Sequence, residues 1–129
     1  MTLDSSALVA ILFSEPGYLD LVDCILEAAT VRAGAPTLVE TGMVLAGRRA
    51  SADARELDGL VRELAVTVVP CGEAEWQAAV VAFSRFGRGR HRASLNFGDC
   101  LAYATAAVAG DALLYVGDDF RLTDIPSAL

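Results

Sequence analysis

Short apolar segments alternate with longer helix-like segments along the chain, and this order restricts the possible folds most. The segments 66–69 and 112–116 are apolar, and the first is rich in β-branched residues, which is typical of buried strands. Apolar spacing predicts a helix over residues 73–86. The overall order, strand–helix–helix three times and then a final strand, favours an α/β fold with a mostly parallel sheet covered by helices. The aromatic residues of the 73–86 helix are predicted to face the core rather than to stack on bases: Trp76, Phe83 and Phe86.

Caps and stop residues predict the remaining elements. Residues 1–4 are expected to form a first strand, and Ser5 or Ser6 to cap the helix that follows. The other predicted elements are a helix from about Tyr18 to Ala29, a strand around Val31, a helix opened by Pro36, a helix over 52–64, and a helix from about Gly98 to Val108, capped by Asn96 and ended by Gly110.

Composition excludes several classes of protein. The chain has 129 residues, 54% of them hydrophobic, so we expect residues 1–129 to form a single domain. Its formal net charge of −7 argues against a protein that coats nucleic acid by bulk positive charge. All ten basic Lys and Arg positions are arginine, which excludes a P-loop nucleotide site, a phosphoacceptor receiver domain and any mechanism that needs a lysine nucleophile.

The cysteines and the N-terminal apolar run predict an intracellular protein without a membrane anchor. Cys24, Cys71 and Cys100 have no CxxC spacing, which fits neither a disulfide framework nor a structural zinc site, so reduced thiols are expected. The apolar run 7–13 lacks a positively charged leader and is too short to span a bilayer.

Acidic residues recur where a predicted strand ends or a helix begins: Asp4, Glu40, Asp99 and the pair Asp118 and Asp119. Because the carboxyl ends of parallel strands share one edge of a sheet, we expect these acids to meet there. Crowded carboxylates repel one another, and Mg²⁺ or Mn²⁺ is the simplest relief. Each acid also has an ordinary explanation, as a helix cap, a solvent-facing helix residue, a first-turn acid or a turn residue.

An arginine-rich segment, 87–92, lies in a stretch without acidic residues between Glu75 and Asp99. A guanidinium group can donate two parallel hydrogen bonds to the oxygens of one phosphate, so this segment is predicted to contact RNA or a protein partner. The alternative is an ordinary solvated loop. His91 is assigned to the same contact rather than to general-base catalysis, because no nucleophile is evident near it. The residues assigned to this contact are Arg88, Arg90, His91 and Arg92.

Four segments together resemble a known family. They are Asp4–Ala10, Glu40 within its apolar helix, Asn96–Ala104, and Leu113–Phe120 followed by Thr123 and Asp124. The chain resembles the PIN-domain ribonucleases, and more closely the VapC-like toxins of type II toxin–antitoxin systems. The resemblance implies a PIN-like three-layer α/β/α fold with a mostly parallel central sheet.

The resemblance also implies roles for individual residues. Asp4 and Asp99 would be the principal metal ligands, and Glu40 a direct or water-mediated ligand. The fourth acid would be Asp119, which precedes Phe120 as in the family's Asp-Phe pair, or its neighbour Asp118. Many family members carry Thr or Ser just before that acid, where this chain has Val116 and Gly117. Ser6 would orient Asp4 or a metal-bound water through its hydroxyl.

The activity implied by the resemblance is Mg²⁺- or Mn²⁺-dependent hydrolysis of RNA by a metal-bound water, leaving a 5′-phosphate and a 3′-hydroxyl. The protein would be a cytoplasmic toxin that is neutralised by a cognate VapB-like antitoxin, and its large aliphatic surface predicts a homodimer. A catalytically silent module that binds RNA or protein is the alternative. A haloacid-dehalogenase-type phosphatase is disfavoured, because Ser6 stands where its second aspartate would be required.

Overall fold

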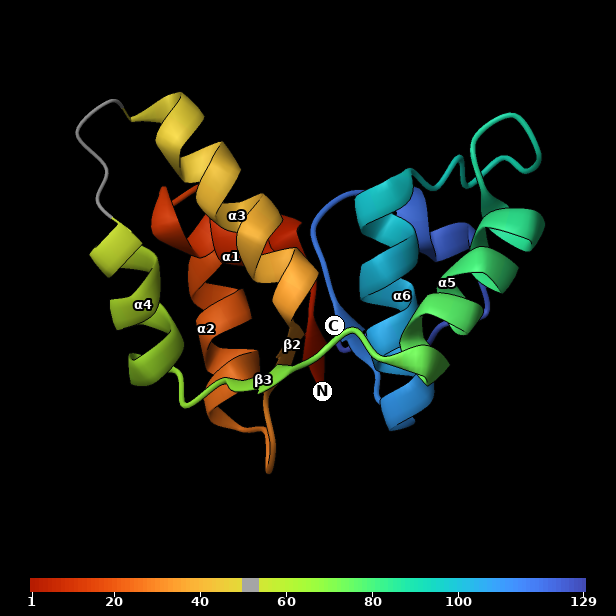
Figure 1. Ribbon diagram of the computed structural model, residues 1–129. Coiled ribbons are helices and arrows are strands. Elements are labelled where there is room, and N and C mark those ends of the chain that lie inside the picture. Colours follow the sequence, from red (N-terminus) through yellow and green to blue (C-terminus); the bar gives the residue numbers. More distant parts are fainter. Residues whose placement is uncertain (50–53) are drawn as a thin grey trace.

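The protein has an α/β fold built on a parallel sheet (Figure 1). The structure, a computed structural model, describes residues 1–49 and 54–129. Within these ranges the sheet has four strands in the order β3–β2–β1–β4, and all of its strand pairs are parallel. The strands are β1 (Thr2–Leu3), β2 (Arg32–Gly34), β3 (Thr67–Val69) and β4 (Leu113–Leu114). The predicted α/β class and order of elements are confirmed.

Two helices follow each of the first three strands, and they cover both faces of the sheet. In Figure 1, the first four helices lie on one side of β1 and β2 and the last two lie on the other, which gives three layers. The helices are α1 (Ser5–Leu12), α2 (Tyr18–Leu26), α3 (Ala35–Arg48), α4 (Ala54–Glu63), α5 (Glu73–Phe86) and α6 (Phe97–Ala109), and a short 3₁₀ helix, η1 (Asp119–Leu122), follows β4. None of the helices described is long and apolar enough to cross a membrane.

Two hydrophobic cores lie on opposite faces of the sheet. Successive residues of a strand point to opposite faces, so Leu113 joins one core and Leu114 the other. The core shared with α5 and α6 includes Ala82, Leu95, Ala102 and Phe120. The core shared with α1 and α2 includes Leu3, Leu8, Leu21 and Ile25.

The start of α1 differs from the prediction. Its N-cap is Asp4, whose side chain accepts a hydrogen bond from the backbone N–H of Ser6, so the prediction of Ser5 or Ser6 as the cap is wrong. The aspartate holds the cap because it stands in extended conformation directly after β1. At the other end of the chain, the predicted Asn96 cap of α6 and its end at Gly110, with a left-handed φ of 67°, are confirmed.

The strand predicted over 66–69 is shorter and less buried than expected. β3 covers Thr67–Val69, and its first two residues are exposed while the third is half-buried, so the prediction of a buried strand is wrong for them. The physical reason is position, because β3 is an edge strand of the sheet. The helix predicted over 52–64 corresponds to α4, and residues 52 and 53 lie outside the described residues.

The aromatic side chains of α5 also differ from the prediction. Trp76 is 52% exposed and Phe83 40% exposed, so placing them in the core was wrong, whereas Phe86 is buried as predicted. α5 packs against α6 through small side chains, Ala79 and Ala82, on its other face. Both faces of this helix are apolar, and hydrophobic spacing alone does not tell which of them meets the core.

Candidate active site

Four acidic residues from four different elements lie at the carboxyl edge of the sheet. Asp4 follows β1, Glu40 lies in α3 directly after β2, Asp99 lies in the first turn of α6, and Asp119 begins η1 after β4. They are close enough to influence one another. The charge of Glu40 raises the pKa of Asp4, and the charges of Asp4 and Asp119 raise the pKa of Asp99.

Asp4 is the most deeply buried of these acids, with only 3% of its surface exposed. Its Oδ2 accepts hydrogen bonds from the backbone N–H of Ser6 at 2.9 Å and from the Ser6 hydroxyl at 2.5 Å. Its Oδ1 is buried and has no hydrogen-bond partner in the described part of the chain. Burial raises the pKa of Asp4, and the two Ser6 hydrogen bonds only partly oppose that effect. A buried carboxylate oxygen without a partner is costly, which makes Oδ1 a ready ligand for a cation.

Ser6 connects two of the acid-bearing segments. While its hydroxyl donates to Asp4, its Oγ also accepts a hydrogen bond from the backbone N–H of Val116 at 2.9 Å. Val116 lies between β4 and the segment that carries Asp118 and Asp119. The serine therefore holds the start of α1 and the segment after β4 together.

Asp99 takes part in the cap of α6. Its Oδ2 accepts from the backbone N–H of Asn96 at 2.7 Å, and the Asn96 side chain accepts in return from the backbone N–H of Asp99 at 3.0 Å. Burial is the main cause of the raised pKa of Asp99, and the charge of Arg88 opposes it. The reciprocal cap fixes the direction of this carboxylate.

Glu40 and the pair Asp118 and Asp119 complete the set. The half-buried Glu40 carboxylate reaches from α3 to the first turn of α6, where it lies against Gly98. Asp118 is 85% exposed in its side chain and pairs with Arg121 at 3.1 Å. Asp119 is also exposed, but its charge acts on Asp99. Of these two neighbouring aspartates, Asp119 is therefore the one whose charge acts on another acid of the set.

The segment after η1 is tied to the helices α5 and α6. Asp124 accepts hydrogen bonds from the Tyr103 hydroxyl at 2.5 Å and from Arg85 at 2.7 Å. The Tyr103 hydrogen bond is the main cause that lowers the pKa of Asp124, whereas burial, together with Asp124, raises the pKa of Tyr103 to about 12. This anchor restrains the chain only a few residues beyond Asp119.

The charges of these acids influence one another, but in the described part of the chain the side chains are not arranged as a ready set of metal ligands. In residues 1–49 and 54–129, no group of three or more His, Cys, Asp or Glu side chains is arranged to hold a metal ion. Asp4 and Asp99 each accept a hydrogen bond that caps a helix. The donors are nevertheless carboxylate oxygens, which Mg²⁺ and Mn²⁺ prefer. Within the described part of the chain, Asp4 Oδ1 has no hydrogen-bond partner that an ion would have to displace.

The arginine-rich segment 87–92 forms an ordered turn beside this cluster. The charge of Arg88 partly opposes the rise in the pKa of Asp99 that burial causes, and the Arg90 guanidinium lies over the Phe83 ring at 5.4 Å. His91 accepts a hydrogen bond at Nδ1 from the backbone N–H of Ala93 and packs edge-on against Phe86. All four residues assigned to partner contact are exposed: Arg88, Arg90, His91 and Arg92.

An apolar surface adjoins the acidic cluster, and the sequence interpretation missed it. Two hollows, of about 720 Å³ between α3 and α6 and about 560 Å³ between α5 and α6, share Phe97 and Leu101. Phe97 is 81% exposed, directly before Gly98 and Asp99. The sequence feature that could have revealed this surface is a second stripe of apolar residues on α3 and on α5, in addition to the stripe that faces the core. We call this region the α3–α5–α6 surface, and define it by Val39, Met43, Trp76, Val80, Phe83 and Phe97.

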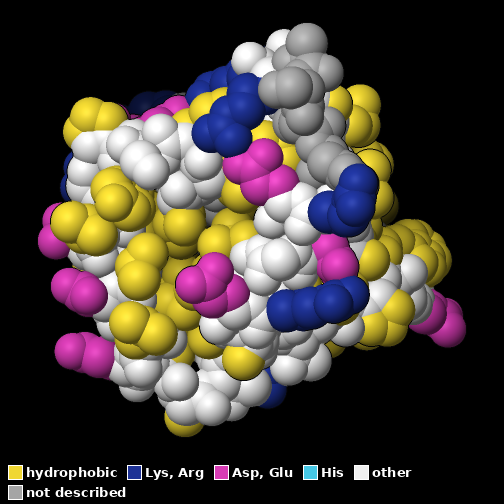
Figure 2. Space-filling view, turned by 90° about the vertical axis from the view of Figure 1, so that its left-hand side faces the viewer, with side chains coloured by type: hydrophobic (Ala, Val, Ile, Leu, Met, Phe, Trp, Pro, Cys, Tyr) yellow, Lys and Arg dark blue, Asp and Glu magenta, His cyan; other side chains and the backbone are white. Residues whose placement is uncertain are grey.

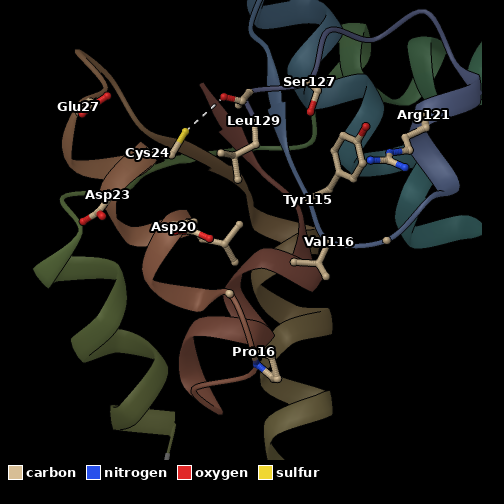
Figure 3. A pocket seen from close by; sticks show the side chains of 14 residues that line it. Pro16, Asp20, Asp23, Cys24, Glu27, Tyr115, Val116, Arg121, Ser127 and Leu129 are labelled. Atoms are coloured by element: carbon tan, nitrogen blue, oxygen red, sulfur yellow. Dashed lines mark hydrogen bonds between the residues drawn. The ribbon is translucent and has the colours of Figure 1, made fainter.

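A third hollow, of about 720 Å³, separates α2 from the C-terminal segment (Figure 3). Asp20 and Asp23 of α2 and Glu27, the C-cap of that helix, line it from one side, and Tyr115 and Arg121 line it from the opposite side. It contains none of the acids predicted for the active site. Figure 2, which views the molecule from the side of α4, shows acidic side chains along its left edge and arginine side chains in its upper and right-hand parts.

Comparison with known proteins gives consistent matches. The PIN domain family matches residues 1–126. Ribonuclease VapC of Mycolicibacterium smegmatis is 40% identical over 125 residues, which cover 97% of each chain. Ribonuclease VapC30 of Mycobacterium tuberculosis is 39% identical over 126 residues, which cover 97% of this chain and 95% of that protein.

Two solved structures share the fold. The crystal structure of Mycobacterium tuberculosis VapC20, described as a Sarcin-Ricin loop cleaving toxin, superposes with a TM-score of 0.73 at 16% identity and covers 96% of this chain and 95% of that one. A toxin–antitoxin complex from Klebsiella pneumoniae superposes with a TM-score of 0.68 at 17% identity and covers 95% and 92%. At these identities the likeness concerns the fold alone.

Proposed function

Because the chain belongs to the PIN-domain family and, within it, to the VapC ribonucleases, we propose that it is a metal-dependent endoribonuclease and the toxin of a toxin–antitoxin pair. The observation that carries the proposal is Asp4, an almost fully buried carboxylate with one oxygen that lacks a hydrogen-bond partner among residues 1–49 and 54–129. A protein does not keep such a group for stability, because burial without a partner is unfavourable. A functional ligand is the consistent explanation.

Asp4 and Asp99 would hold Mg²⁺ or Mn²⁺, with Glu40 as a direct or water-mediated ligand and Asp119 as the fourth acid. The influence of Glu40 on Asp4, and of Asp119 on Asp99, supports this set. The pairing of Asp118 with Arg121 favours Asp119 over its neighbour. When bound, the divalent ion supplies Lewis acidity towards the phosphate and makes water nucleophilic at neutral pH.

The protein side chains contribute orientation. Ser6 donates to Asp4 Oδ2, so Oδ1, which has no hydrogen-bond partner among the described residues, would be the oxygen that holds the ion. The Asn96 cap orients Asp99 in the same way, since it engages Oδ2. Both carboxylates must be ionised to bind a cation, so their raised pKa values set the acid limit of activity above that of a free aspartate.

The arginine-rich turn would bind the RNA backbone. Arg88 is the arginine of this turn whose charge acts on Asp99. Arg90 and Arg92 extend the positive charge along the same turn. Guanidinium groups there would reduce the repulsion between a polyanion and an acidic site. His91, with one ring nitrogen already engaged, would contribute a contact rather than proton transfer.

We further propose that residues 1–129 are a single domain that acts in the cytoplasm and binds a VapB-like antitoxin. The match of the family over residues 1–126 and the toxin–antitoxin complex with a similar fold support these proposals. Cleavage would leave a 5′-phosphate and a 3′-hydroxyl.

A homodimer is also proposed, and the α3–α5–α6 surface supports it. Burying an aromatic side chain covers about 150–250 Å², so the exposed fractions of Trp76, Phe83 and Phe97, at 52%, 40% and 81%, leave roughly 350 Å² of aromatic surface. Together with Val39 and Met43 this is a large part of the roughly 800 Å² that each partner buries in a stable interface.

Incubation with total cellular RNA tests the proposed activity. The purified protein is incubated with and without Mg²⁺ or Mn²⁺, beside an Asp99→Asn variant, and the new 5′ ends are sequenced. Discrete cuts that need the metal and are lost in the variant are expected. RNA binding without cuts under any metal would instead identify a silent binding module.

A further inference from the structure

We propose that Gly98 is a positioning residue for Glu40, because the Glu40 carboxylate occupies the space that a side chain at position 98 would fill. The inference rests on the proposed function insofar as Glu40 serves the metal site. It concerns a residue that touches neither the ion nor the RNA in the mechanism above, and that acts only through its neighbour.

The geometry leaves no room for a side chain at position 98 while Glu40 keeps its present conformation. A Cβ atom built at Gly98 would lie 2.5 Å from Glu40 Oε2, 2.6 Å from Oε1 and 2.8 Å from Cδ. All three distances are far below van der Waals contact, so a larger residue and the present Glu40 conformation exclude each other.

The backbone does not explain this glycine. Gly98 lies inside α6, and the glycines that need the left-handed region are others, at positions 17, 89, 110 and 117. A helical position without a side chain is normally unfavourable, because glycine loses the most conformational freedom on folding. The close approach of Glu40 is therefore what the glycine permits.

The first turn of α6 is a favourable place for the carboxylate. The N–H groups of a first turn have no partner within the helix, and they carry the positive end of the helix dipole. From this position the charge of Glu40 still reaches Asp4, whose pKa it raises. Gly98 thus lets Glu40 lie against the first turn of α6 while its charge still acts on Asp4.

A side chain at position 98 would displace Glu40 without unfolding the protein. The atoms in the way are the end of a flexible side chain, and the hollow of about 720 Å³ lined by Glu40, Gly98, Val39 and Met43 offers space beside it. The carboxylate would turn into that apolar hollow and away from the other acids. Alanine is favoured over glycine inside a helix, so the variant is expected to fold.

The test compares Gly98→Ala with Gly47→Ala and Gly59→Ala. The two controls make the same change inside α3 and α4, where an added Cβ meets nothing within 4 Å. We expect all three variants to melt no earlier than the wild type. Only Gly98→Ala should bind Mn²⁺ more weakly, at least about threefold by titration calorimetry, and cleave RNA roughly ten- to a hundredfold more slowly, as a misplacement of about 1 Å can cause.

A double-mutant cycle separates positioning from a general structural effect. In a Glu40→Gln background, Gly98→Ala should cause little further loss of Mn²⁺ affinity, because the carboxylate through which it acts is already removed. An equal loss in both backgrounds, or unchanged Mn²⁺ binding in the single variant, would overturn the proposal.

The outcome can be distinguished from a failure of the proposed function. If the wild type cleaves no RNA under any metal, the proposed function fails while the Mn²⁺ titration and a crystal structure of Gly98→Ala still test Gly98. A structure in which the Glu40 carboxylate has left the first turn of α6 supports the inference. A structure in which it keeps its place would overturn it, whatever the activity.

Discussion

The acidic cluster and the α3–α5–α6 surface meet within three consecutive residues, and they break opposite rules of protein folding. At Asp99 and at the nearby Asp4, carboxylates are removed from water and their pKa values rise. At Phe97, an aromatic ring is left 81% exposed. A buried carboxylate with a raised pKa is typical of a functional site, because a bound cation would relieve the cost of its burial, whereas an exposed apolar surface is typical of a macromolecular contact. The proposed metal site and the proposed partner surface therefore adjoin where α6 begins.

The largest effect is expected for Asp4→Asn, which tests whether the buried charge exists for function. Cleavage should fall at least about a hundred- to a thousandfold, the usual cost of removing one electrostatic group from an active site. The melting temperature should rise, because a buried charge is removed and asparagine remains a good N-cap. Calorimetry and a cleavage assay measure both. Asp20→Asn, at an exposed carboxylate, is the control that should change neither, and a lower melting temperature for Asp4→Asn would contradict the argument.

A smaller loss is expected for Ser6→Ala, which removes the link between Asp4 and Val116. Residues that orient a metal ligand typically contribute about ten- to a hundredfold to affinity or activity. We expect a loss of that size in cleavage and in Mn²⁺ affinity. Ser84→Ala removes an exposed helix hydroxyl and serves as the control. Activity within twofold of the wild type would show that the link is dispensable.

The other side of the comparison is tested by Trp76→Glu on the α3–α5–α6 surface. If this surface is covered by a second copy, a charge at an aromatic position should weaken self-association roughly tenfold or more, as for an interface hot spot. Sedimentation velocity over a concentration series measures the shift to monomer. Leu26→Glu changes a 70% exposed side chain on α2 and should have no effect. A wild type that remains monomeric throughout would remove the basis for the homodimer.

The smallest effect concerns pH and stability. Because the folded pKa values of Asp4 and Asp99 are raised, the folded state keeps these protons to higher pH than the unfolded state does. Their contribution to the free energy of unfolding therefore declines as pH rises from about 3.8, the ordinary aspartate value, through the raised folded values, and is constant above them. Melting temperatures across this window should show a flatter dependence for Asp4→Asn. A slope equal to that of the wild type would mean that folding does not raise the pKa of Asp4.

Much of the fold followed from local sequence. The order of strands and helices, the Asn96 cap and the end of α6 at Gly110 were all predictable, because propensities, caps and turn conformations act between residues close in the chain. The rule for parallel sheets also predicted that distant acids would gather at one edge, and the structure places Asp4 and Asp99 within electrostatic reach of each other.

What remained open depended on which surfaces face one another. Periodicity showed that Trp76 and Phe83 lie on an apolar side of a helix, and only the packing of α5 on α6 decided that this side is exposed. Likewise, only the strand order of the sheet decided that β3 lies at an edge and is therefore mostly exposed.

The sequence by itself thus determined the elements, their order and the residue types available for chemistry. Only the tertiary structure decided that one oxygen of Asp4 has no partner in the described chain and that Glu40 fills the space over Gly98. Burial and close approach join residues that are far apart in the chain, and no local pattern encodes those contacts.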